Sequence, residues 1–231
     1  MKLHARTRTT LAWSLWLATL GCCAGGQVAT LALIRPLTLA ILAEGAAFAL
    51  AFPLGFATVG LVMTLRLPAN PIGWLYAAAG LAWSWDIPFW PWIDRLVHDH
   101  RPLPLVAQLV AVVGDLGWAP AIALGVTLPA LLLPDGRLRS PRWRVGVATA
   151  VAGPILFMVG ALLHPGPVGE VPVPFDNPFG LAGVAGRIAA VVLNIGLVLH
   201  WVSLPAAAVW VSRTGRSPSR CVMPGKRPSM P

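Results

Sequence analysis

Long apolar runs alternate along the chain with short clusters of polar and charged residues. Six runs can be traced, at about 11–34, 37–65, 72–90, 105–133, 145–163 and 183–211. Each is about 20 residues or longer, which is the length that an α-helix needs to cross the hydrocarbon core of a bilayer. In lipid the backbone polar groups must be satisfied within the segment, so such runs predict helices. The pattern predicts an all-α integral membrane protein with six transmembrane helices.

Charged or proline-containing segments separate the runs. They lie at 35–36, 66–71, 94–104, 134–137 and 164–180. Proline stops helices and restricts the residue before it, so these segments are expected to be turns and loops. Pro53 and Glu44 lie inside the second run, which predicts that this helix starts late or kinks. The domain boundaries that follow are a short N-terminus at 1–10, a membrane domain at 11–211 and a basic, disordered tail at 212–231.

Arginine and lysine indicate the orientation of the predicted helices. With the N-terminus in the cytoplasm, 13 Lys and Arg residues fall on the inner side and 4 on the outer side. Such an asymmetry sets membrane orientation, and an odd number of spans would scramble it. Tryptophans near the expected ends of the runs agree with aromatic belts at the two interfaces. We therefore expect both termini in the cytoplasm and a multi-pass protein of the plasma membrane.

Composition agrees with lipid as the main surrounding of the chain. Apolar residues make up 57% and charged residues 11%, whereas soluble domains carry about 25% charged residues. The net charge is +9, but the basic residues flank the apolar runs, so topology explains them better than nucleic-acid binding does. We expect no nucleic-acid partner. The sequence also shows no pattern for a cofactor or for catalysis.

Three ordered motifs carry a family resemblance. They are Arg-Leu-Pro-Ala-Asn-Pro-Ile-Gly-Trp-Leu at 66–75, Leu-Pro-Asp-Gly-Arg-Leu-Arg-Ser-Pro-Arg-Trp-Arg at 133–144 and Asp-Asn-Pro-Phe-Gly-Leu at 176–181. In this order they resemble the N-terminal membrane region of actinobacterial two-component sensor histidine kinases, over about residues 1–212. The motif residues are Asn70, Pro71, Gly73, Trp74, Pro134, Asp135, Gly136, Arg137, Asn177, Pro178 and Gly180.

The resemblance implies a sensory input module for signal transduction. In that family a dimerisation domain with the phosphoacceptor histidine and an ATP-binding domain follow the last span. The segment after about Val211 contains no histidine and no nucleotide-binding motif. We therefore expect no enzymatic activity and a truncated or frameshifted kinase product. Such a module would act in the bilayer as a homodimer or beside an intact sensor kinase. The alternatives are a small transporter or permease subunit, and a structural membrane protein.

Ionisable residues inside predicted spans are candidates for function. Counted from the cytoplasmic ends at 1.5 Å per residue, Glu44 lies about 32 Å up, Asp115 about 27 Å and Asp86 about 21 Å. Trp83 and Trp85 fall at similar depths. These five residues predict an acidic, aromatic pocket in the outer half that suits a cation or an amphiphile. The alternative is that they are interfacial residues that contact headgroups and water, with Asp115 paired to Arg187.

Two groups of histidines complete the candidates. His200 lies about 18 Å up, near the middle of the bilayer, and could sense pH because the intrinsic pKa of histidine is about 6.5. The other interpretation is a neutral histidine hydrogen-bonded to a neighbouring helix. His98 and His100 flank Asp99 in an outer loop, a spacing too weak to predict a metal site.

Overall fold

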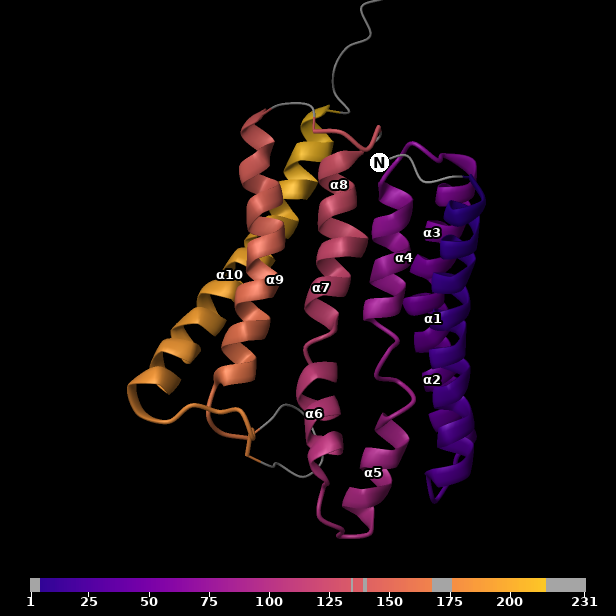
Figure 1. Ribbon diagram of the computed structural model, residues 1–231, viewed down its shortest axis with the longest axis vertical. Coiled ribbons are helices and arrows are strands. Elements are labelled where there is room, and N and C mark those ends of the chain that lie inside the picture. The colour runs from indigo at the N-terminus through magenta and orange to yellow at the C-terminus, as the bar shows by residue number, and fades with distance from the viewer. Residues whose placement is uncertain (1–4, 134, 139–140, 168–175, 215–231) are drawn as a thin grey trace, which may run out of the picture.

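The computed structural model describes residues 5–133, 135–138, 141–167 and 176–214, and these are helical without a β-strand (Figure 1). The helices in chain order are α1 (Ala5–Leu33), α2 (Leu39–Ala51), α3 (Pro53–Arg66), α4 (Ile72–Ala82), α5 (Trp90–His98), α6 (Leu105–Gly114), α7 (Trp118–Ile122), the π-helix η1 (Ala123–Thr127), α8 (Leu128–Leu132), the 3-10 helix η2 (Pro141–Trp143), α9 (Arg144–Leu163) and α10 (Gly183–Thr214).

Five helical stretches are long and apolar enough to cross a membrane, which confirms the all-α membrane-type fold. They are Ala5–Leu33, Leu39–Arg66, Leu105–Leu132, Arg144–Leu163 and Gly183–Pro205. The second stretch is interrupted at Phe52, which has a φ of −109° and a ψ of −78°. Pro53 follows it as the first residue of α3. The interruption predicted from Pro53 therefore lies one residue before it.

The predicted third span, 72–90, differs from the structure. Its helix α4 ends at Ala82 after 11 residues, turns occupy 83–89, and α5 begins at Trp90. Pro88 has no N–H to donate to a helical ladder, and the short polar side chains of Ser84 and Asp86 favour local turns over helix. One apolar run has thus become two short helices with a break between them.

The helices form one bundle with both described ends of the chain at the same end of it (Figure 1). α4 and α5 follow one another along the bundle, and α6, α7 and α8 run back beside them. α1 to α3 lie on one side of this central pair, and α9 and α10 on the other. α10 extends the predicted sixth span to Thr214, and the tail beyond it lies outside the described residues.

Small residues allow the helices to approach closely, as is common where helices pack in lipid. A Cβ atom added at Gly80 of α4 would lie 2.6 Å from the carbonyl oxygen of Pro53 in α3. One added at Gly153 of α9 would lie 2.7 Å from the backbone nitrogen of His200 in α10. The two pairs α3–α4 and α9–α10 are therefore held at backbone contact.

Two of the three motifs meet in space. The side-chain oxygen of Asn70 accepts a hydrogen bond from the Ile72 backbone nitrogen at 3.0 Å and so forms the turn that starts α4. Gly136 has a φ of +70°, and an added Cβ there would lie 2.6 Å from the Asn70 side-chain oxygen. The turns at 66–71 and 135–138 are thus packed against each other at the end of the bundle where α1 begins.

The third motif closes the end of α9. The side-chain nitrogen of Asn177 donates to the carbonyl oxygens of Leu162 at 2.8 Å, His164 at 3.0 Å and Ala161 at 3.3 Å, and its side-chain oxygen accepts from the Phe179 backbone nitrogen at 3.0 Å. Carbonyl groups at a helix C-terminus lack the usual partner four residues on, and the Ala161 oxygen also accepts from the His164 backbone nitrogen at 3.3 Å. Asn177 therefore ties the loop at 176–181 to the C-terminus of α9.

The other motif residues have simpler positions. Gly73 is buried against α3, Trp74 and Gly180 are half-buried, and Pro71, Asp135, Arg137 and Pro178 are exposed. Pro134 lies outside the described residues.

Candidate binding site

Two breaks in the central helices lie side by side. The first is the turn segment 83–89 between α4 and α5, and the second is 115–117 between α6 and α7. A Cβ atom added at Gly114 would lie 2.8 Å from a carboxylate oxygen of Asp86, so the absence of a side chain there lets the two segments touch. The breaks therefore bring Asp86 and Asp115, which are 29 positions apart in the sequence, to one place.

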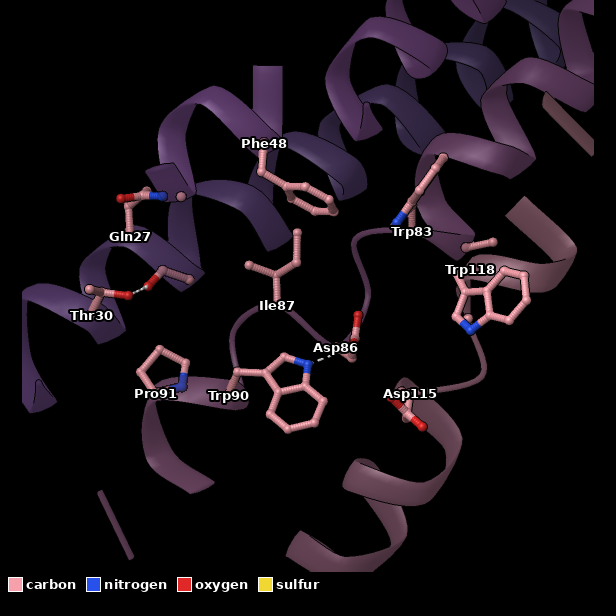
Figure 2. A pocket seen from close by; sticks show the side chains of 15 residues that line it. Gln27, Thr30, Phe48, Trp83, Asp86, Ile87, Trp90, Pro91, Asp115 and Trp118 are labelled. Atoms are coloured by element: carbon pink, nitrogen blue, oxygen red, sulfur yellow. Dashed lines mark hydrogen bonds between the residues drawn. The ribbon is translucent and has the colours of Figure 1, made fainter. Parts of the chain in front are cut away.

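A cavity of about 390 Å³ lies at these breaks (Figure 2). Its walls come from α1, α2, the two breaks and the starts of α5 and α7. The lining residues are Gly26, Gln27, Thr30, Gly45, Phe48, Ala82, Trp83, Asp86, Ile87, Trp90, Pro91, Gly114, Asp115, Gly117 and Trp118. Three of the five residues predicted for an acidic, aromatic pocket, Trp83, Asp86 and Asp115, are among them.

The described lining residues carry negative charge. They include two carboxylates, Asp86 and Asp115, and no Lys, Arg or His is among them. One oxygen of Asp86 accepts a hydrogen bond of 2.7 Å from the Trp90 indole nitrogen, drawn as a dashed line in Figure 2. Arg187, considered as a partner of Asp115, is exposed on α10 and is not part of the lining. Carboxylates in an apolar surrounding are costly unless a cation or a proton compensates them.

Aromatic rings form one rigid wall of the cavity. The Trp83 ring lies 4.9 Å from that of Phe52, 5.9 Å from Phe56 and 6.2 Å from Phe48, measured between centroids. These spacings are within the range of favourable aromatic pairs. The rings hold Trp83 in place, and its indole faces the cavity beside Phe48 (Figure 2).

Two predicted pocket residues lie elsewhere. Glu44 is exposed on α2, although its neighbour Gly45 lines the cavity. Trp85 is half-buried against the second break, where a Cβ at Gly117 would lie 3.5 Å from its indole nitrogen. The prediction used depth along each helix, and depth carries no information about which way a side chain points.

Trp90 and Trp118 line the cavity and were missed among the candidates. Trp90 lies in the aromatic stretch 83–92 of the sequence, and Trp118 follows Asp115 by three positions. A continuous helix through 105–133 would have placed Trp118 on the same face as Asp115. That spacing was the available signal for Trp118.

His200 is fully buried at a different site. Its ring lies 5.5 Å from the rings of both Trp118 and Trp201, edge to face. Within the described part of the chain, neither ring nitrogen has a hydrogen-bond partner. The expected hydrogen bond to a neighbouring helix is thus not found among these residues, and pH sensing by His200 stays a prediction.

Among the described residues, no group of three or more His, Cys, Asp and Glu side chains could hold a metal ion. His98, the last residue of α5, and His100 are exposed, and Asp99 between them pairs with Arg95 at 2.9 Å. Asp99 therefore forms a salt bridge with α5.

No family model, curated protein or solved structure matches this chain. The likeness to sensor histidine kinases therefore depends on the three motifs alone.

Proposed function

We propose that this chain is a membrane-embedded sensory input module that binds an organic cation at the two helix breaks. One observation carries the proposal: the described residues that line the cavity combine two carboxylates with four aromatic side chains, and none of them is basic. An acidic cavity in a low-dielectric surrounding favours positive charge strongly, because little solvent screens the interaction.

Aromatic lining favours an organic cation over a metal ion. Trp83, Trp90 and Trp118 present indole rings, which attract ammonium groups through cation–π interactions of about 0.5–2 kcal/mol each. Hard metal ions instead require six or more oxygen ligands for calcium, or near-ideal octahedral geometry for magnesium. Two carboxylates beside three indoles fit an alkylammonium ion better.

The sensory interpretation is supported by where the charges lie. Both lining carboxylates lie at the breaks, while the α3–α4 pair is closed by contacts such as that of Gly80 with Pro53. Among the described lining residues, the charged side chains occur at the breaks alone. Three motifs of the sensor-kinase type accompany it, and each forms a defined turn. The module would pass its signal to a second copy or to an intact sensor kinase in the same bilayer.

A transporter subunit is the second candidate, and the broken helices favour it. In many transporters the substrate site is formed by discontinuous helices that lie next to each other near the middle of the bilayer. α4–α5 and α6–α8 have that arrangement. A transporter would move the cation across the membrane, whereas a sensory module would only bind it.

Binding of tetraethylammonium to the protein in lipid nanodiscs tests the proposal. We expect saturable binding to the wild type, and about tenfold or greater weakening in Asp86→Asn and Asp115→Asn, because each loses one unit of charge with little change in shape. Glu44→Gln is the matched control, because it removes the same charge from an exposed position outside the lining. The neutral isostere 3,3-diethylpentane should not compete.

The outcomes separate the candidates. Equal weakening by all three substitutions would mean that only the overall surface charge matters, and the site would be refuted. Uptake of radiolabelled tetraethylammonium into sealed proteoliposomes, lost in Asp86→Asn, would favour transport. Binding without uptake supports the sensory module.

A further inference from the structure

We infer that Trp118 transmits occupancy of the cavity to α10, the last helix of the bundle. The inference rests on the proposed function, because it assumes that a cation enters the cavity. It goes further by naming the residue and the helix through which binding would be read.

Trp118 belongs to two groups of side chains at once. It lines the cavity together with Asp86 and Asp115. Its ring also lies 5.2 Å from that of Phe157 in α9 and 6.0 Å from that of Trp201 in α10, stacked at 28° on the latter. A change in the position of the Trp118 ring at the cavity must therefore be accommodated by α9 and α10.

His200 provides a second contact between Trp118 and α10. It is fully buried, its ring lies 5.5 Å from that of Trp118 and edge to face with it, and its backbone lies against α9, where a Cβ added at Gly153 would be 2.7 Å from the His200 backbone nitrogen. Packed interiors have few voids and transmit displacements. A displacement of the Trp118 ring therefore reaches α10 at His200, at the point where the backbones of α9 and α10 touch.

The segment that carries Trp118 is irregular on both sides. The helix break at 115–117 lies directly before it, and there the backbone bonds change to i→i+3 pairs, from the Leu116 nitrogen to the Val113 oxygen and from the Gly117 nitrogen to the Gly114 oxygen. The π-helix Ala123–Thr127 follows directly after it. Single π-turns inside α-helices are rare and are frequent at functional sites. Trp118 therefore stands on a short helix, five residues long, with an irregular segment at each end.

A spin-label distance measurement tests the coupling. Labels at Val62 on α3 and Val198 on α10, both exposed, report the position of α10 in a variant whose native cysteines are replaced by serine. We expect saturating tetraethylammonium to shift the distance distribution in the wild-type background and Trp118→Leu to abolish the shift. Trp118→Leu also weakens binding, so the comparison is made at saturation.

A second variant separates coupling from binding. Trp201→Leu removes the stacking partner on α10 without touching the lining, so the dissociation constant should stay while the shift is reduced. Trp13→Leu is the matched control, because Trp13 is 44% exposed on α1 and Trp201 is 50% exposed. It should keep both binding and the shift.

Each outcome decides between the two proposals. Saturable binding to the wild type with no distance shift would overturn the coupling alone. A full shift in Trp118→Leu or in Trp201→Leu would overturn it as well. Absence of saturable binding to the wild type would overturn the proposed function, and the coupling would fall with it.

Discussion

Replacing Gly136 by alanine tests whether the turns at 66–71 and 135–138 are locked together. Gly136 has a φ of +70°, and an added Cβ would lie 2.6 Å from the Asn70 side-chain oxygen and would also overlap Pro71. Gly183 provides a matched control. Its φ is +66°, and nothing lies within 4 Å of a Cβ added there.

Gly136→Ala and Gly183→Ala introduce the same backbone strain, but only Gly136→Ala also introduces a steric overlap. Alanine in the left-handed region costs about 1–2 kcal/mol at either position. At Gly136 the overlap with Asn70 and Pro71 adds an overpacking cost of about 1–3 kcal/mol. We therefore expect Gly136→Ala to lower the free energy of unfolding by about 2–5 kcal/mol and Gly183→Ala by about 1–2 kcal/mol.

Unfolding in mixed micelles of SDS and dodecyl maltoside, followed by tryptophan fluorescence, gives both free energies on one scale. The difference between the variants isolates the contact between the turns. Equal destabilisation by Gly136→Ala and Gly183→Ala would refute the contact, and with it the idea that the first two motifs form one structural unit.

Two further substitutions probe the third motif and the cavity. Asn177→Ala should lower the unfolding free energy by about 2–3 kcal/mol, since the three shorter of its four side-chain hydrogen bonds contribute about 1 kcal/mol each. Asn194→Ala is the control, because this exposed side chain donates to the Ala190 carbonyl oxygen within its own helix; it should cost under about 1 kcal/mol in the same titration, and equal values would contradict the capping role. Gly114→Ala should weaken tetraethylammonium binding in nanodiscs, because its Cβ would displace the Asp86 carboxylate, and unchanged binding would contradict the contact between the breaks.

The lengths of the apolar runs predicted most of the fold, because bilayer thickness sets the length of a helix that crosses it. Five of the six predicted runs correspond to helical stretches long enough to cross a membrane. The run at 72–90 was predicted as one span because its mean apolarity hides the short polar side chains and prolines after Ala82. A hydropathy window averages over about 19 residues, so it cannot resolve a break of seven.

The site could be predicted only in part for a related reason. Depth along each helix follows from counting residues, which is why Asp86 and Asp115 were both predicted in the outer half of the bilayer. Orientation around each helix follows from packing, which the sequence does not show. Glu44 was therefore included although it is exposed, and Trp118 was omitted although it lines the cavity.

The helix breaks and the acidic charge arise from the same residues. A carboxylate in the middle of a continuous helix would have to face lipid or a closely packed neighbour, and both are costly. At a break the backbone turns away, which opens space beside the side chain and leaves backbone groups that polar side chains can satisfy. Asp86 occupies such a turn, where its carboxylate accepts from Trp90 and rests against the bare backbone of Gly114. A substitution that made either helix continuous would therefore remove the cavity even if both carboxylates were kept.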